Sequence, residues 1–252
     1  MIIVGLHHKD PRKAIWNDVE CGGYEADLPL WEELAGELDD DEKIIELGCG
    51  AGRVVRHLAS RFPQLVIGLD DDPNLVEAVW DRCHGTTGDA EYGDVRKFDI
   101  GTDFGLALAP MQLIQLLANS RQRRACLACV YDSISLLSKA AFAIVDELPP
   151  PPPESALPPL PDVRQVDGWI YSSLPLESIF EADWILLRRL RQTVSPGGEM
   201  TEELNNVELR TLSAAKLEEE ATEVGFKPIG RREIPPTEAH VGSTVVLLEK
   251  SL

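Results

Sequence analysis

The chain has 252 residues, of which 44% are hydrophobic, and a formal net charge of −19 at pH 7. This length suits one α/β domain with an insertion, or one domain with a small partner domain. The negative charge argues against DNA or RNA as a ligand, because nucleic-acid binding depends on Lys and Arg contacts to phosphates. A small-molecule ligand is therefore favoured; the alternative is that the charge serves solubility only.

The sequence predicts neither membrane insertion nor secretion. No uninterrupted run of 18 apolar residues occurs, and residues 1–8 lack the basic region of a signal peptide. We therefore expect a cytoplasmic protein. Five scattered cysteines form no disulfide framework, and Cys126 and Cys129 lie in a predicted helix without a second cysteine pair. We expect this pair to pack in the interior, and we expect no metal site.

In chain order, residues 1–42 are predicted to form a helical cap in front of the core. Residues 11–20 are predicted to form a short helix, and residues 26–39 carry apolar side chains at helix-like spacing. The core is predicted at residues 43–148 and 213–252, and an insertion at residues 149–212 separates its two parts.

Strands and helices alternate through the first part of the core. The expected strands are 43–48, 65–70, 89–93, 104–109 and 141–147, and the expected helices are 52–61, 73–82, 111–118 and 121–138. Buried, branched strands that alternate with helices predict a parallel sheet covered on both faces. Ligands of such sheets bind at the carboxyl ends of the strands.

A glycine turn links the first strand to the first core helix, in the sequence Glu46-Leu-Gly-Cys-Gly-Ala-Gly52. Glycine lets the backbone turn sharply and approach a ligand, and the following helix N-terminus can hold an anionic group. The dinucleotide-binding pattern G-x-G-x-x-G would need its third glycine at position 53, where the chain has Arg53. A nicotinamide-dependent oxidoreductase is therefore the weaker alternative.

The pattern E-x-G-x-G-x-G resembles motif I of the class I S-adenosylmethionine-dependent methyltransferases. A second buried strand that ends in an acid, Leu65-Val-Ile-Gly-Leu-Asp70, follows in the expected order. The resemblance covers roughly residues 24–148 and 213–252. It implies a Rossmann-like doubly wound sheet, mostly parallel, whose last strand is antiparallel and lies between the fifth and sixth strands.

The resemblance also implies S-adenosylmethionine as the cofactor and S-adenosylhomocysteine as the product. Glu46 and the glycine turn would hold the amino-acid end, Asp70 the ribose and Asp94 the adenine. Tyr24 matches a tyrosine that often lies along the methionine part, although it could equally pack against the first helix. The predicted cofactor-binding residues are Tyr24, Glu46, Gly48, Cys49, Gly50, Gly52, Asp70, Asp71, Asp94, Val95 and Ala109.

Catalytic residues are less clearly marked. Met111 and Gln112 follow the fourth strand, at the position that faces the methyl group in related enzymes. The local sequence is A-P-M-Q, whereas enzymes that methylate DNA bases have N-P-P-Y, so a nucleic-acid substrate is again disfavoured. Gln112 is expected either to bond the sulfonium end or substrate, or to cap the next helix. His240 is a candidate general base for O-methylation because histidine titrates near neutrality, and its alternative is a surface-loop histidine.

The insertion begins with a proline-rich run at residues 148–162, which is expected to lie over the pocket or to act as a stiff linker. Antiparallel strands are predicted at 166–173, 184–194 and 203–212, with a hairpin turn at 195–198. Small-molecule methyltransferases often carry substrate-binding or dimer-forming elements at this point. The expected substrate contacts are Met111, Tyr171 and Ser173, with Trp169 and Ser172 beside them; packing of a small sheet is the alternative.

The chain closes with a predicted helix at 213–224, capped by Ser213 and ended by Gly225, and strands at 227–234 and 244–250. The sequence therefore predicts an enzyme that transfers a methyl group from S-adenosylmethionine to N or O of a small molecule. A cofactor-binding protein without turnover is the main alternative. Strand edges in the insertion could pair across a homodimer.

Overall fold

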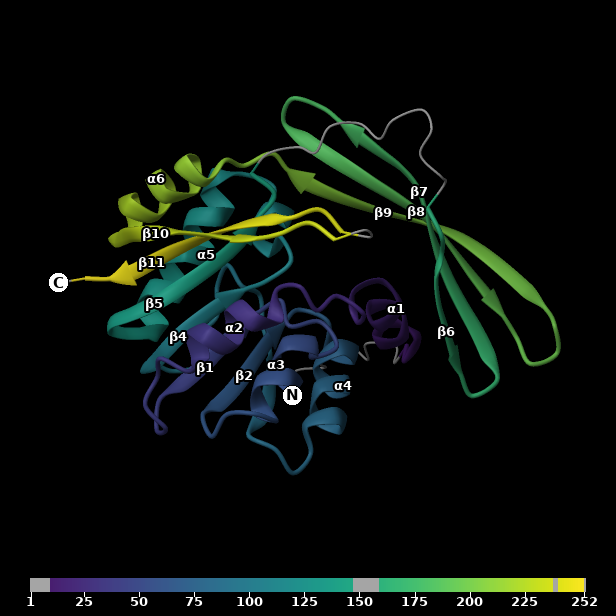
Figure 1. The fold of residues 1–252 in the computed structure, drawn as a ribbon, viewed down its shortest axis with the longest axis horizontal. Coiled ribbons are helices and arrows are strands. Elements are labelled where there is room, and N and C mark those ends of the chain that lie inside the picture. The colour runs from purple at the N-terminus through teal and green to yellow at the C-terminus, as the bar shows by residue number, and fades with distance from the viewer. Residues whose placement is uncertain (1–9, 147–158, 238–239, 252) are drawn as a thin grey trace, which may run out of the picture.

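The computed structural model describes residues 10–146, 159–237 and 240–251, and it contains two β-sheets (Figure 1). The larger sheet has seven strands in the order β10-β11-β5-β4-β1-β2-β3, and the smaller sheet has four in the order β6-β7-β8-β9. The smaller sheet projects from one side of the helix-covered core. The proline-rich run falls mainly on residues 147–158, which lie outside the described residues.

The large sheet is the core that the sequence predicts. Its strands are β1 (Lys43–Leu47), β2 (Leu65–Asp70), β3 (Gly88–Tyr92), β4 (Phe104–Ala109), β5 (Ile134–Ile144), β10 (Phe226–Ile234) and β11 (Ser243–Lys250). Strands β1 to β5 pair in parallel. Strand β11 is antiparallel to both neighbours, β5 and β10, which confirms the predicted place of the last strand.

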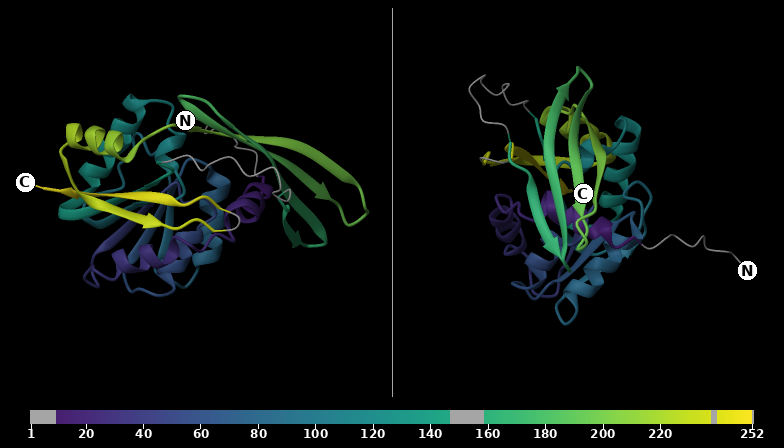
Figure 2. Two further views of the ribbon diagram at one scale, coloured as in Figure 1. Left: turned by 45° about the horizontal axis from the view of Figure 1, so that its top comes forward. Right: turned by 90° about the vertical axis from the view of Figure 1, so that its right-hand side faces the viewer.

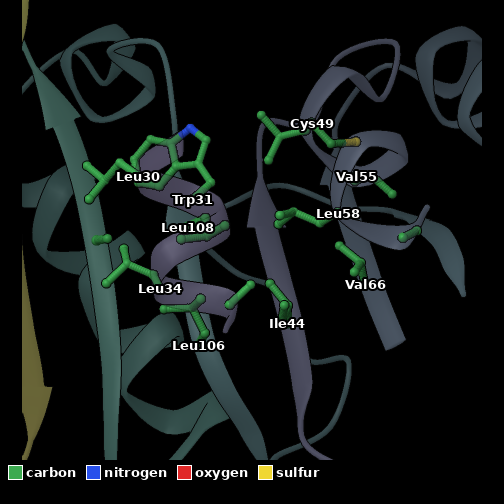
Figure 3. Close-up of a cluster of buried hydrophobic side chains, with 14 of the residues drawn as sticks. Leu30, Trp31, Leu34, Ile44, Cys49, Val55, Leu58, Val66, Leu106 and Leu108 are labelled. Carbon is green, nitrogen blue, oxygen red and sulfur yellow. The ribbon is translucent and has the colours of Figure 1, made fainter. Parts of the chain in front are cut away.

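Helices cover both faces of this sheet. They are α1 (Arg12–Cys21), α2 (Leu28–Ala35), α3 (Arg53–Ala59), α4 (Pro73–Cys83), α5 (Ser120–Ser133) and α6 (Ala214–Val224). Figure 3 shows part of the core on one face, where Trp31 and Leu34 of α2 lie beside Leu106 and Leu108 of β4. On the other face, side chains of α5 and α6 pack against β4, β5 and β11. Both layers are apolar, as an α/β sheet buried on two sides requires.

Two helix signals are confirmed at atomic detail. The Asp72 side chain accepts a hydrogen bond from the backbone of Asn74 and caps α4, whose first residue is proline. The Ser213 side chain caps α6 in the same way, and Gly225 ends that helix with a left-handed backbone.

Two predicted helices are wrong in extent. The helix predicted at 121–138 ends at Ser133, and the chain continues directly as β5. Leu136 and Leu137 extend the apolar pattern of the sequence, but both side chains are exposed and Leu137 has a positive φ of 67°. The helix predicted at 111–118 is only a single 3₁₀ turn, η1 (Leu113–Leu116), because Met111 and Gln112 have left-handed backbones.

The insertion is antiparallel, as predicted, but has four strands. These are β6 (Asp162–Val166), β7 (Trp169–Phe180), β8 (Trp184–Val194) and β9 (Met200–Arg210). The single strand predicted at 166–173 is wrong, because a two-residue turn at Asp167 and Gly168, with φ values of 50° and 82°, separates β6 from β7. The turn after β8 is confirmed, with the Gly198 N–H donating to the Ser195 carbonyl.

Candidate cofactor site

The glycine turn follows β1 at the carboxyl edge of the large sheet. Gly48, Gly50 and Gly52 all have positive φ values, of 61°, 55° and 83°. A Cβ at position 50 would lie 2.7 Å from Nδ2 of Asn17, and a Cβ at position 48 would lie 2.5 Å from Cδ1 of Leu113. The turn therefore needs glycine both for its backbone conformation and for the close approach of its neighbours.

Glu46 is the last acid before the turn and is almost fully buried, with 3% of its surface exposed. Its Oε2 accepts a hydrogen bond of 2.8 Å from the backbone N–H of Val55, in the first turn of α3. Burial raises the pKa of Glu46 to about 8, against the opposing effect of the Arg53 charge. This buried carboxyl group forms part of the wall of a cavity.

Asp70 ties the end of β2 to the glycine turn. Its Oδ2 accepts from the Gly50 N–H at 2.9 Å, and its Oδ1 accepts from the Asp72 N–H at 3.0 Å. Burial raises its pKa above the ordinary value. The expected contact of Asp70 with a ribose stays a prediction, as does any role of Asp71, whose side chain is exposed.

A cavity of about 170 Å³ lies against the turn. It brings together four of the predicted cofactor residues, Glu46, Gly48, Cys49 and Gly50, and the predicted substrate residue Met111. The remaining lining residues are Asn17, Cys21, Arg53, Pro110, Leu113 and Leu116. The sequence prediction missed the contributions of Asn17 and Cys21, which come from α1 and which no local motif marks.

A second cavity, of about 220 Å³, lies at the opposite end of the sheet, where Gly105 and Leu106 begin β4. Ligands of parallel sheets bind at the carboxyl ends of the strands, so this cavity is not the candidate site.

Arg53 joins the turn to the segment before α2. Its guanidinium group donates to both carboxylate oxygens of Asp27, at 2.7 and 2.6 Å, and to the backbone carbonyl of Tyr24 at 2.8 Å. The Tyr24 ring lies 5.3 Å from the guanidinium carbon of Arg53 and 4.7 Å, between ring centres, from His240. The structure thus places two predicted site residues, Tyr24 and His240, next to each other. Burial lowers the pKa of His240 below its ordinary value.

Gln112 occupies the N-cap position of η1, but its side chain makes no capping hydrogen bond, so the predicted cap by this side chain is wrong. Its Nε2 instead donates to Oγ of Ser243 at 2.9 Å, which links the end of β4 to the start of β11.

Asp94 forms a two-bond ion pair with Arg96, and these hydrogen bonds lower the pKa of Asp94 to about 2. A contact of Asp94 or its neighbour Val95 with adenine stays a prediction. Ala109 is buried at the end of β4.

Tyr171 and Ser173 lie on the face of the small sheet that meets α1, and neither lines the cavity. The Tyr171 ring packs edge-on against Trp16 at 5.2 Å. The Ser173 hydroxyl donates to Glu20 at 2.8 Å and accepts from Arg189 at 2.7 Å. Both residues therefore pack the sheet against α1, and a direct substrate contact for them stays a prediction.

Among residues 10–146, 159–237 and 240–251, no cluster of three or more His, Cys, Asp or Glu side chains could hold a metal ion. None of the helices described is long and apolar enough to span a membrane. All five cysteines are free, and Cys126 is buried in α5 as expected.

Similarity to known proteins falls on the glycine-turn half of the chain. Residues 44–134 match the family model described as a methyltransferase domain. The trans-aconitate 2-methyltransferase of Mycobacterium tuberculosis is 43% identical over 54 residues, which make up 21% of this chain and 21% of that protein. The matched segment thus spans about a fifth of the length of the curated relatives.

Solved structures resemble the whole chain in fold. An amino pentose methyltransferase from Micromonospora echinaspora superposes with a TM-score of 0.68 at 16% identity, covering 92% of this chain and 96% of its own. A sugar N-methyltransferase from Streptoalloteichus sp. superposes with a TM-score of 0.71 at 13% identity, covering 100% and 97%. At these identities the likeness shows the fold alone. Residues 44–134 are therefore similar to a methyltransferase domain, and the chain has the same fold as these solved methyltransferases.

Proposed function

We propose that the protein transfers a methyl group from S-adenosylmethionine to N or O of a small molecule. One observation carries this proposal. The glycine turn and the buried Glu46 form a cavity at the carboxyl edge of the sheet, within the residues that match a methyltransferase domain.

The residues around the cavity suit this cofactor. Gly48, Cys49 and Gly50 bring the backbone of the turn to the wall of the cavity, and the carboxyl group of Glu46 offers an acceptor oxygen to an amino group. Glu46 and the turn would hold the amino-acid end, Asp70 the ribose and Asp94 the adenine. The cofactor supplies a methyl group already activated by its sulfonium. The protein therefore has to align the acceptor with that methyl group and to exclude water.

His240 is the proposed base. Because burial lowers its pKa, the imidazole is neutral near pH 7 and can take a proton from the acceptor. The His240 ring packs against the Tyr24 ring. Arg53, which follows the glycine turn, also contacts the Tyr24 ring.

The charges around His240 favour an amine over a carboxylic acid as the acceptor. Two arginines act on the histidine electrostatically, and each is already paired: Arg53 with Asp27, and Arg189 with Asp162. Recognition of a carboxylate commonly uses an unpaired arginine or lysine. The net charge of −19 also favours cationic ligands. The sugar N-methyltransferase and the amino pentose methyltransferase of similar fold are named for amine and amino-sugar chemistry.

We also propose that two copies of the chain associate through the outer face of the small sheet. Two cross-strand rows on this face are apolar, Ile170–Val194–Met200 and Leu174–Leu190–Leu204. The side chains that alternate with them along the strands, Tyr171, Ser173 and Arg191 among them, face α1. A polar row, Ser172–Gln192–Glu202, lies between the two apolar rows. Met200 and Leu204 are 59% and 61% exposed, and exposed apolar side chains next to polar ones are typical of an interaction surface. The right-hand view in Figure 2 looks onto this side of the molecule.

The cofactor is tested by the heat of binding of S-adenosylhomocysteine, with NAD as the control ligand. We expect one site with a Kd in the micromolar range for the former and no heat for the latter. Asp70→Ala is expected to weaken binding strongly, and Asp81→Ala, an exposed acid on α4, serves as the matched control. Binding of NAD alone would favour the oxidoreductase.

Turnover is tested by methyl transfer to a panel of amines, phenols and carboxylic acids. Transfer to amines is the expected result. Transfer to carboxylic acids would contradict the amine assignment but keep the methyltransferase. Tight binding of S-adenosylhomocysteine without transfer to any class would support the alternative of a binding protein without turnover.

A further inference from the structure

Helix α1 lies between the small sheet and the core, as Figure 1 shows. Two adjacent stripes of this ten-residue helix meet different partners. Trp16 and Glu20, four residues apart, face the small sheet, whereas Asn17 and Cys21, also four apart, face the cofactor cavity. One short helix thus contacts both the small sheet and the glycine turn.

On the sheet side, the contacts form a partly buried polar cluster. Arg191 of β8 donates to both carboxylate oxygens of Glu20, through Nε at 2.8 Å and Nη2 at 2.7 Å. Ser173 donates to the same carboxylate at 2.8 Å and is 0% exposed. The guanidinium carbon of Arg191 also lies 5.0 Å from the Trp16 ring centre. Two-bond arginine–carboxylate pairs fix orientation as well as distance, so this cluster sets how α1 lies on the sheet.

On the cavity side, α1 holds the glycine turn directly. Oδ1 of Asn17 accepts from the Ala51 N–H at 3.0 Å, and the Asn17 side chain occupies the space that a Cβ at Gly50 would need. Asp18 pairs with Arg82, which also donates to the Ala51 carbonyl at 2.8 Å. The backbone of Ala51 is therefore bonded at its N–H to Asn17 of α1 and at its carbonyl to Arg82 of α4, which pairs with α1.

Helix α1 depends on these contacts for its position. Its N-cap residue, Pro11, makes no side-chain cap, and an isolated helix of ten residues is marginal in water. Only Ala14, Trp16 and Val19 of α1 are buried. Loss of the Glu20–Arg191 pair would remove a two-bond contact between α1 and the small sheet. The Trp16–Tyr171 contact, the Ser173–Glu20 hydrogen bond and the Asp18–Arg164 ion pair would remain, so Asn17 would be held less firmly against the turn.

We propose that the Glu20–Arg191 pair is a positioning element for cofactor binding, which acts through α1 to hold Asn17 against Ala51 of the glycine turn. The small sheet thereby sets the affinity of a cavity that none of its own side chains lines. This inference rests on the proposed function only for the identity of the cofactor used as a probe.

The test compares two arginines of the full chain that make the same pair of bonds. Arg191→Met removes the bonds to Glu20, and Arg231→Met removes the bonds of Nε and Nη2, at 2.7 and 2.8 Å, to Glu218 on the far side of the core. We expect the Kd for S-adenosylhomocysteine to rise at least about tenfold in Arg191→Met and to stay within about twofold in Arg231→Met. Arg191→Lys should recover part of the loss. Equal affinities for Arg191→Met and the wild type would overturn the proposal.

A double variant separates positioning from general destabilisation. Asn17→Ala alone should weaken binding about as much as Arg191→Met, and the double variant should be no weaker than Asn17→Ala within about twofold, because both changes break the same linkage. If the fold-increases in Kd of the two single variants multiply in the double variant, Arg191 affects binding independently of Asn17. If Arg191→Met does not fold, Glu20→Gln, which keeps the side-chain size, carries the same expectations.

A measurement without ligand distinguishes failure of this inference from failure of the proposed function. Hydrogen exchange of the Ala51 N–H should be faster in Arg191→Met than in Arg231→Met, because its bond to Asn17 is weakened. Faster exchange with no binding of S-adenosylhomocysteine in the wild type would support the linkage and contradict the cofactor. Equal exchange in the two variants would overturn the linkage, whatever the wild type binds.

Discussion

At the scale of single residues, Glu46 is the most unusual group in the site. A carboxyl group that is almost fully buried, with one hydrogen bond from Val55 and a pKa raised to about 8, is largely protonated in the folded chain near pH 7. In the unfolded chain the same group would ionise near its ordinary pKa of 4.5. Between these two pKa values, folding is therefore coupled to the uptake of a proton by Glu46.

This gives a prediction for stability. Between about pH 5 and 8 the folded chain holds more protons at Glu46 than the unfolded chain, so the free energy of unfolding falls as pH rises, by at most about 1.4 kcal/mol per pH unit. Glu46→Gln keeps the size of the side chain and cannot ionise, so its stability should fall less over the same range. Urea unfolding at pH 5.5 and 8 measures the difference. The same decrease in both proteins would contradict the raised pKa.

His240 gives a prediction for catalysis. A histidine whose pKa is lowered by burial is charged only in acid, so kcat should be flat near pH 7 and above and should fall at a pH lower than the ordinary histidine pKa of 6.5. His240→Asn should lower kcat by a factor of about 10² and leave the affinity for S-adenosylhomocysteine unchanged. His84→Asn, at the exposed end of α4, is the control. Wild-type kcat in the His240 variant would rule out its role as base.

The residues of the glycine turn could be predicted because their signal is local. Glu46, Gly48 and Gly50 lie within five positions, and their chemistry follows from that spacing alone. Asn17 could not be predicted, because its contact with Ala51 joins positions 34 residues apart and depends on how α1 docks. Tyr171 and Ser173 are predicted as substrate contacts, but the side of the sheet on which they are buried depends on how α1 docks, which no local pattern shows.

At the scale of elements, the order of strands and helices was predictable because the apolar pattern changes period between them. The boundary between α5 and β5 was not, because Leu136 and Leu137 continue the apolar pattern while they are exposed. The Asp167-Gly168 turn carried a readable signal: an Asp-Gly pair is typical of a tight hairpin. The hydrogen bond of Gln112 could not be predicted, because its partner Ser243 lies 131 positions further along the chain.

At the scale of the whole molecule, the outer face of the small sheet predicts a dimer. Light scattering should give a mass twice the 27.8 kDa of one chain. Leu204→Glu places a charge at the β9 end of an apolar row and should give a single-chain mass, because a buried unpaired charge is costly. Leu136→Glu, an exposed leucine on the core with similar exposure, is the control and should stay dimeric. A wild-type mass of one chain at tens of micromolar would contradict the proposal.

The position of β11 between β5 and β10 also affects how the molecule can assemble. Strand β10 is hydrogen-bonded only to β11 among the described strands, and β11 joins β5 across roughly a hundred residues, including the whole insertion. The small sheet, by contrast, is built from neighbouring hairpins and needs no distant partner. Pairings between distant segments carry the larger cost in loop-closure entropy. Since His240 lies between β10 and β11, the position of the proposed base depends on the most distant closure of the sheet, the pairing of β11 with β5.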